Sequence, residues 1–255
     1  MLKLSKLSCP SALYFKTMAL LLVMSLFFPI RHVFLTSEAY LTGQYSDFTS
    51  FSLYLSDILI FTTWFLLIIS RDGKTCLKIK GFFLYPKPYT LNPILWLILL
   101  LFLGFVVNFG LNTRLNWYLL VKWLELIVAY GTLVVIIKEF GLKSTLLKLF
   151  AWLCSLQAVI ALVQFTRQSP LGLFKVGEYH IGPAILGVAK IVSGGTTYIR
   201  GYGTFPHPNP LSAFLVAGIF VILYLLVTSA SLKWKLIYSG LLLLNILGLT
   251  VTFSR

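Results

Sequence analysis

Acidic side chains are scarce in this chain, which has seven Asp and Glu residues among 255. Charged residues of both signs make up 11% of the sequence, whereas soluble domains are about one quarter charged. Hydrophobic residues make up 58%, and the mean hydropathy is +0.91. These values exclude a soluble globular domain of this length and predict an integral membrane protein.

Cysteine and histidine are also sparse, with three residues of each. The cysteines show no disulfide framework, and the histidines are dispersed rather than spaced as zinc ligands. The sequence has no acidic cluster for a divalent cation, no G-x-S-x-G nucleophile motif and no phosphate-binding P-loop. We therefore expect no metal and no cofactor, and any transfer reaction would be metal-independent.

Long hydrophobic runs are what the chain does contain. A helix needs about 17 to 25 apolar residues to cross a bilayer, and the runs of Leu, Ile, Val and Phe reach this length. We predict an all-α integral membrane protein with about seven transmembrane helices in a single transmembrane domain, residues 1–255. The predicted spans are 14–30, 51–69, 91–109, 117–137, 146–165, 211–227 and 236–253.

The formal net charge of +14 would fit a nucleic-acid-binding protein, but the basic residues sort by predicted side of the membrane. Alternate connections between the spans are rich in Lys and Arg, and the intervening connections are poorer. The positive-inside rule therefore predicts a multi-pass protein with a cytoplasmic N-terminus, which contacts membrane lipids and binds no nucleic acid. The basic residues of the predicted cytoplasmic connections are Lys3, Lys6, Lys16, Arg71, Lys74, Lys78, Lys80, Lys87, Lys138, Lys143, Lys148, Lys233 and Lys235.

One predicted external connection is long and runs over residues 166–209. Long loops between membrane helices usually carry function. Within it, two β-prone runs at 188–192 and 196–200 flank Ser193-Gly194-Gly195 and predict a short β-hairpin. An external turn without a ligand would give the same pattern, so the hairpin alone does not indicate binding.

The hairpin leads into residues 200–210, which read Arg-Gly-Tyr-Gly-Thr-Phe-Pro-His-Pro-Asn-Pro and precede the span that begins at Leu211. The glycines allow close backbone approach and the prolines fix φ, so Arg200, His207 and Asn209 are expected to be held in place. Arginine pairs bidentately with phosphate oxygens, which favours an anionic substrate. Lipid-linked pyrophosphate meets this requirement.

Three charged side chains fall within predicted spans, where a charge is costly unless it is paired or faces water. Asp57 lies in the second span. Lys122 and Glu125 lie in the fourth, three residues apart and therefore on one face of the helix. All three map to the outer half of the membrane, on the same side as the Arg200 loop. The alternative to substrate binding is a Lys122–Glu125 pair that packs helices, with Asp57 as a satisfied polar group.

Several segments resemble the O-antigen ligase and O-antigen polymerase family. The segments that carry the resemblance are Gly187-Val188-Ala189-Lys190, residues 200–209, Lys122-Trp123-Leu124-Glu125, Arg31 after the first span, and Thr252-Phe253-Ser254-Arg255. The resemblance spans nearly the whole chain. Members of the family have more membrane helices than are predicted here, so the chain looks like the N-terminal portion of a larger multi-span protein.

This resemblance implies a membrane glycosyltransferase at the outer face of the cytoplasmic (inner) membrane, with external arginines that hold undecaprenyl pyrophosphate. The donor would be a lipid-linked glycan and the acceptor a glycan, a lipid or a protein. A ligase, a chain polymerase and a protein O-oligosaccharyltransferase all stay open. The implied substrate-binding residues are Arg200, Arg255, His207, Asn209, Arg31, Lys122 and Glu125.

The catalytic residue is left unknown. The family's general base is a histidine in a later external loop, expected beyond residue 255, so His207 is expected to shape the proline-bracketed turn rather than to act as the base. A transporter or flippase of lipid-linked glycan is the alternative function, because Asp57, Lys122 and Glu125 could line a pathway. Transport predicts polar groups at both faces, and here they gather at the outer half. A scaffold without catalysis does not account for the clustered Arg, His and Asn side chains.

Overall fold

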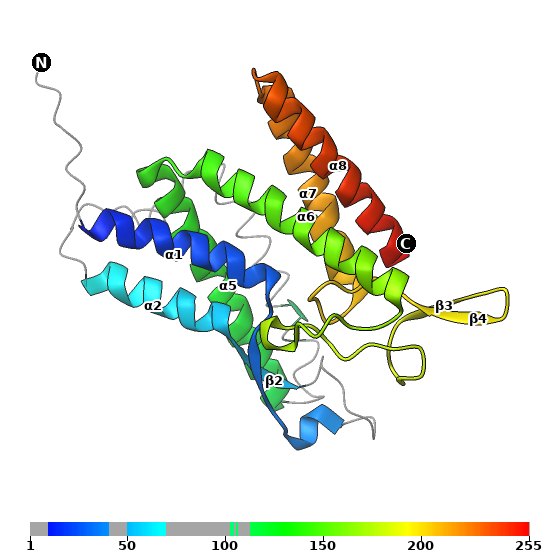
Figure 1. Ribbon diagram of the computed structural model, residues 1–255. Coiled ribbons are helices and arrows are strands. Elements are labelled where there is room, and N and C mark those ends of the chain that lie inside the picture. The colour runs from blue at the N-terminus through cyan, green and yellow to red at the C-terminus, as the bar shows by residue number, and fades with distance from the viewer. Residues whose placement is uncertain (1–9, 41–49, 70–102, 105, 107–112, 255) are drawn as a thin grey trace, which may run out of the picture. The chain divides into compact units, whose positions relative to one another are not determined.

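The computed structural model describes residues 10–40, 50–69, 103–104, 106 and 113–254 (Figure 1). These residues form mainly α-helices, with two small antiparallel sheets of two strands each. The chain divides into two compact units. Unit 1 contains residues 1–19 and 31–142, and unit 2 contains residues 20–30 and 143–255.

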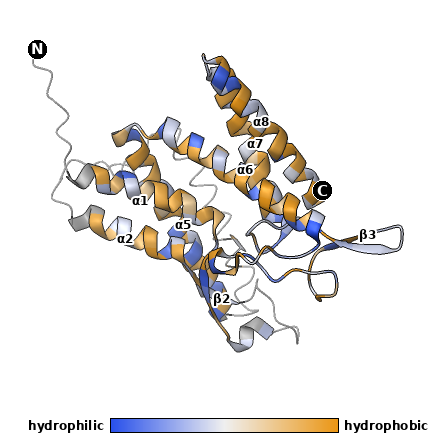
Figure 2. Ribbon diagram, in the orientation of Figure 1, coloured by the Kyte–Doolittle hydropathy of each residue, from blue (hydrophilic) through white to orange (hydrophobic). Residues whose placement is uncertain are grey.

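Among the described residues, four helices have the length and apolar composition needed to cross a bilayer, and the protein is therefore membrane-embedded. They are α5 (Thr113–Phe140), α6 (Lys143–Arg167), α7 (Pro208–Thr228) and α8 (Leu232–Thr252). Two further apolar helices, α1 (Pro10–Phe27) and α2 (Leu55–Ile69), are shorter. Hydrophobic residues dominate these helices (Figure 2). The count of seven spans stays a prediction, and the third predicted span, 91–109, lies largely outside the described residues.

Unit 1 corrects the start of the second predicted span, because residues 51–54 are a strand rather than a helix. Strand β2 (Phe51–Tyr54) pairs antiparallel with β1 (Arg31–Phe34), which is followed by the 3₁₀ turn η1 (Ser37–Tyr40). The backbone N–H of Tyr54 donates to the Asp57 carboxylate at 2.9 Å, as in a capping box. This bond satisfies one N–H at the start of α2, and the helix begins at Leu55.

Unit 2 is built on the helices α6, α7 and α8, and each runs in the opposite direction to the one before it (Figure 1). The C-terminal ends of α6 and α8 and the N-terminal end of α7 therefore meet at one end of the unit. Small residues let the helices approach closely: a Cβ added at Gly218 of α7 would lie 2.7 Å from Cys154 Cβ, and one at Gly248 of α8 would lie 2.5 Å from Ala158 Cβ. Such contacts are typical of helix packing in membranes, where dispersion rather than water exclusion drives association.

A buried polar bond also joins α8 to α6. The side-chain amide of Asn245 donates to Ser155 Oγ at 2.7 Å and to the Leu241 carbonyl at 2.8 Å. Both Asn245 and Ser155 are buried. Hydrogen bonds of this kind between apolar helices contribute about 0.6 to 2 kcal/mol and fix the register of the two helices.

The predicted hairpin of the long connection is confirmed. Strands β3 (Lys190–Ser193) and β4 (Thr196–Ile199) pair antiparallel, with Ser193 opposite Thr196. Gly194 and Gly195 have φ of +57° and +79°, and positive φ at both central positions is what a type I′ turn requires. The hairpin projects beyond the helices of unit 2 (Figure 1). The same connection holds the 3₁₀ turn η2 (Phe174–Val176).

We predict that Gly248→Ala destabilises the protein by about 1 to 3 kcal/mol, the usual cost of overpacking, because its Cβ would collide with the backbone of α6 as well as with the Ala158 side chain. Gly240→Ala, on the same helix, is the matched control, since nothing lies within 4 Å of its added Cβ. The measurement is thermal unfolding of the purified protein in detergent. Equal melting temperatures for the two variants would contradict the close α6–α8 contact.

Candidate functional site

Two buried glutamines of α6 hold the backbone of the 200–210 loop. Gln157 and Gln164 are seven residues apart and therefore lie on one face of the helix. The Gln164 carboxamide accepts from the N–H groups of Tyr202 and Gly203, at 3.1 and 2.8 Å, and donates to the Gly203 carbonyl at 2.8 Å. Gln157 accepts from the Thr204 N–H at 2.9 Å and donates to the Thr204 hydroxyl at 2.9 Å.

The loop requires glycine at position 203. Gly203 has a φ of +61°, in the left-handed region that side chains disfavour. A Cβ at this position would also lie 2.5 Å from the Gln157 carboxamide oxygen. The second glycine of the Arg-Gly-Tyr-Gly sequence therefore allows the backbone to reach the carboxamides of α6.

A buried glutamate, Glu178, holds the first part of the long connection, which precedes the β3–β4 hairpin. It is 5% exposed, and its carboxylate accepts from the Gln164 amide at 2.8 Å, from the Leu171 N–H at 2.7 Å and from the Leu173 N–H. Three donors compensate this carboxylate, which has no cation partner within the part of the chain that the structure describes. Glu178 is thereby a structural partner of Gln164, and it orders the chain on both sides of η2.

Arg200 lies where this loop meets the end of α8. Its Nε donates to the Thr252 carbonyl, and its Nη2 donates to the side-chain oxygen of Asn209 at 3.0 Å. Ser254 also donates its hydroxyl to that oxygen, at 3.2 Å. Two of the five guanidinium N–H groups are thus used, which leaves three. Within the described residues, these three N–H groups have no acceptor and Arg200 has no carboxylate partner.

The guanidinium is held half-buried at the protein surface. Burial lowers the pKa of Arg200, but the ordinary pKa of arginine is so high that the side chain stays charged. Its neighbour Tyr202 is buried, and its phenol oxygen accepts from the Ala189 N–H at 2.5 Å. Burial raises the pKa of Tyr202, so it stays neutral. Arg200 therefore provides a fixed positive charge with donors to spare.

His207 is the N-cap of α7. Its backbone is extended, and its Nδ1 accepts from the Asn209 N–H at 3.2 Å, while Pro208 occupies the first position of the helix. Burial, followed by the positive charge of Arg200, lowers the pKa of His207. The ring is therefore neutral near pH 7, with Nδ1 as acceptor and the proton on Nε2. The predicted role of His207 in shaping the turn is confirmed.

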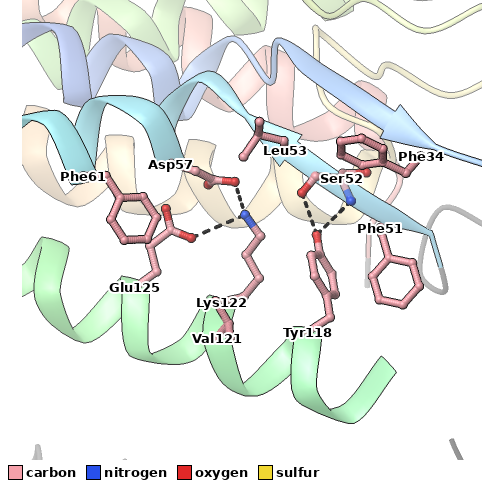
Figure 3. A pocket seen from close by; sticks show the side chains of 10 residues that line it. All are labelled: Phe34, Phe51, Ser52, Leu53, Asp57, Phe61, Tyr118, Val121, Lys122 and Glu125. Carbon is pink, nitrogen blue, oxygen red and sulfur yellow. Dashed lines mark hydrogen bonds and ion pairs between the residues drawn. The ribbon is translucent and has the colours of Figure 1, made fainter. Parts of the chain in front are cut away.

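The intramembrane charges of unit 1 form a second cluster (Figure 3). The Lys122 ammonium of α5 contacts the Asp57 carboxylate of α2 and lies 3.4 Å from Glu125 Oε2. The Lys122–Glu125 pair expected from their spacing is confirmed. Asp57, expected to be a satisfied polar group, is the closer partner of Lys122, because α2 packs on α5.

Aromatic rings complete the surroundings of Lys122. Its ammonium lies 5.3 Å from the ring centroid of Tyr54 and 5.7 Å from that of Tyr118. Arg31 also contacts Tyr54. The Nη1 of Arg31 lies 3.3 Å from the Tyr54 phenol oxygen, and the Arg31 guanidinium carbon lies 5.9 Å from the centroid of the Tyr54 ring. The Tyr118 hydroxyl bonds the backbone of Ser52 in both directions, at 2.9 and 3.1 Å. Arg31 and Lys122 are thus joined through one tyrosine.

The structure therefore distributes the predicted site residues over two clusters. Arg200, His207 and Asn209 come together in unit 2, and Arg31, Lys122 and Glu125 lie in unit 1. Arg255 lies outside the described residues. Five further residues hold these clusters in place and were not predicted from the sequence: Gln157, Gln164, Glu178, Tyr54 and Tyr118. A pair of glutamines seven apart in an apolar helix is the signal that could have identified the first two.

The described residues contain no group of three His, Cys, Asp or Glu side chains that could hold a metal ion. No family model, no curated protein and no solved structure matches this chain.

We predict that Asp57→Asn destabilises the protein more than Glu125→Gln. Asp57 accepts from both Lys122 and the Tyr54 N–H, and we expect a loss of about 2 to 3 kcal/mol, whereas Glu125 makes a single long contact and should cost about 1 kcal/mol or less. Unfolding of each purified variant in detergent at neutral pH measures both losses of stability. A larger loss for Glu125→Gln would show that it, rather than Asp57, is the main partner of Lys122.

The lowered pKa of His207 predicts a loss of stability in mild acid. Because the pKa of the folded state lies below about 6.5, the ordinary value of an unfolded chain, the unfolded state binds more protons. Stability should therefore be full above pH ~6.5 and should fall as the pH decreases below it. His207→Asn, which can still cap α7, should show a shallower decline between pH 7 and 5. Identical pH profiles would contradict a neutral, capping His207.

Proposed function

We propose that this protein is a membrane glycosyltransferase of the O-antigen ligase type, which transfers or polymerises glycan from an undecaprenyl-pyrophosphate donor at the outer face of the cytoplasmic membrane. The observation that carries the proposal is the Arg200 guanidinium. It is fixed by the Thr252 carbonyl and the Asn209 side chain, and three of its N–H groups have no acceptor among the described residues. A charged fork held in this way suits a phosphate oxygen pair.

The meeting of two separate motif segments supports the same proposal. Residues 200–209 and 252–254 are far apart in the sequence, and both contribute to the resemblance to the ligase family. Asn209 Oδ1 accepts from both Arg200 and Ser254, so the side chains of the two segments bond a single atom. Segments that build one site are expected to be brought together in this manner.

The charge distribution of unit 2 supports an external position for the loop. The opposite end of the helices carries Lys143 and Lys148 of α6 and Lys233 and Lys235 of α8. Lys143 lies 5.5 Å from the ring centroid of Tyr224, and Lys148 lies 5.7 Å from that of Trp234. Lysine and aromatic side chains gather at membrane interfaces, and an excess of lysine favours the cytoplasmic side. The Arg200 end would then face outward.

In the proposed reaction, a hydroxyl oxygen of the acceptor attacks the anomeric carbon of the donor glycan. The bond from that carbon to the pyrophosphate oxygen breaks, and undecaprenyl pyrophosphate leaves with the electron pair. Arg200 stabilises the negative charge that grows on the leaving group, and a general base takes the hydroxyl proton. His207 is not proposed as that base, because its Nδ1 lone pair already accepts the Asn209 N–H. Its Nε2–H can donate to a phosphate oxygen instead.

The alternative, a transporter or flippase of lipid-linked glycan, rests on the charged cavity of unit 1, where Asp57, Lys122 and Glu125 lie within the membrane-embedded part of the chain. Transport requires charges that exchange partners along a pathway. Here Lys122 contacts both carboxylates at once. This arrangement favours a fixed cluster over a pathway.

We predict that Arg200→Ala reduces transfer from undecaprenyl-pyrophosphate glycan by about 100-fold or more, the typical cost of removing a donor that stabilises transition-state charge. Arg200→Lys should lose most of that activity, because lysine keeps the charge but not the planar fork. The assay is glycan transfer in membranes that contain the full-length protein, with protein abundance measured by blot.

Arg167→Ala is the matched control, since Arg167 is an exposed arginine at the end of α6 and should leave transfer within about twofold of the wild type. Normal transfer by Arg200→Ala at normal abundance would remove Arg200 from the mechanism. Loss of lipid-linked glycan movement across the membrane with transfer intact would favour the flippase.

A further inference from the structure

Unit 1 contains a cavity of about 230 Å³ between β2, α2 and α5 (Figure 3). Its walls are apolar and mainly aromatic, with Phe34, Phe51 and Phe61 among the lining residues. Its charged lining is the cluster of Asp57 and the two charged residues of α5 described above. Pockets for drug-sized ligands occupy about 300 to 1,000 Å³, so this cavity fits a smaller molecule.

The charges that line the cavity do not balance. Two carboxylates, Asp57 and Glu125, face one ammonium, that of Lys122, so the charged lining carries a formal charge of −1 when both carboxylates are ionised. The tyrosine rings beside Lys122 present their negative faces to that ammonium and add no positive charge. An anion such as pyrophosphate would therefore meet a surplus of negative charge here, whereas a cation would neutralise it.

Two buried acceptors at the cavity also lack partners. Glu125 Oε1 and Ser52 Oγ have no hydrogen-bond partner among the described residues, and both residues are more than nine-tenths buried. Buried polar atoms are nearly always bonded, because leaving a charged acceptor unpaired in an apolar environment is costly. A ligand that completes this site must bring N–H donors to the free oxygen of Glu125.

We propose that the cavity binds a primary ammonium group on a short apolar stem. The ammonium would donate to Glu125 Oε1 and neutralise the surplus charge, and the stem would lie against the phenylalanine rings. Aromatic rings are a recurrent feature of sites that bind alkylammonium ligands. The same chemistry is offered by the ethanolamine headgroup of a phospholipid and by a free amine. This site is separate from the Arg200 site, and the proposal does not depend on glycan transfer.

The test is calorimetric titration of butylammonium into the full-length protein in nanodiscs of phosphatidylglycerol, with 1-butanol and butyrate as the neutral and anionic probes. Butylammonium should bind, and the other two probes should bind at least about tenfold more weakly, because neither can form the charged hydrogen bond to Glu125. Glu125→Gln should weaken butylammonium binding by about tenfold or more for the same reason.

Phe61→Ala and Phe65→Ala form a matched pair on α2. Phe61 lines the cavity and Phe65 does not, while their side chains are similarly exposed, at 53% and 59%. Phe61→Ala should weaken butylammonium binding by about two- to fivefold, and Phe65→Ala should leave it unchanged. Since neither side chain is buried, both variants should fold, which thermal unfolding checks.

Nanodiscs of phosphatidylethanolamine distinguish a lipid headgroup from a free amine as the source of the ammonium group. Strong inhibition of butylammonium binding in these nanodiscs would identify the lipid headgroup as the occupant, and unchanged binding would identify a free amine. No binding of butylammonium to the wild type in phosphatidylglycerol, equal binding of 1-butanol, tighter binding of butyrate or an unaltered affinity in folded Glu125→Gln would each overturn the proposal.

Discussion

The hydrogen bonds from two carboxamides of α6 to the loop backbone are the constraint on which the organisation of unit 2 depends. The side chains of Gln157 and Gln164 supply both donors and acceptors. They bond loop N–H and C=O groups that would be paired with other backbone groups in a regular helix or sheet. The loop thereby enters the apolar helices without leaving its N–H and C=O groups unpaired. The loop leads directly into α7, whose N-cap is His207.

The two polar clusters solve the same problem in different ways. In unit 1, Lys122 is surrounded by two carboxylates and two aromatic rings, so the neighbouring side chains neutralise its positive charge. In unit 2, Arg200 is held by a carbonyl and an amide oxygen, which orient the guanidinium without neutralising it. A charge that is oriented but not neutralised is available to an external anion. The difference lies in the chemistry of the acceptors rather than in the cations.

Composition and local spacing were sufficient to predict the helical, membrane-embedded character, the β3–β4 hairpin and the Lys122–Glu125 pair. Each depends on residues close in sequence: continuous apolar runs, a Gly-Gly turn and a three-residue interval. The strand at Phe51–Tyr54 was missed because its partner, β1, is separated by a long connection and its own residues are as apolar as those of a helix. Apolar runs do not distinguish a strand from the first turn of a membrane helix.

The contacts that organise the candidate site could not be predicted from the sequence either, because they join residues that are far apart in the chain. Glu178 meets Gln164 across 14 residues, and Gln157 meets Thr204 across 47. No periodicity links such positions, because their proximity is set by how α6, α7 and α8 pack. The role of Asn245 as a bond between α8 and α6 likewise depends on packing and not on a local pattern.

The contact of Arg200 with α8 is made to the backbone carbonyl of Thr252, and the Thr252 side chain bonds its own helix instead. The guanidinium is thus insensitive to which side chain stands at the end of α8 and sensitive to where that helix stops. Adding one residue within α8 would rotate its final carbonyl by about 100° and move it along the axis by about 1.5 Å, away from the guanidinium. Gly248 fixes α8 against α6, so the number of residues from Gly248 to the last turn of α8 determines where the Thr252 carbonyl lies. That carbonyl in turn determines the direction in which the Arg200 guanidinium points at the surface.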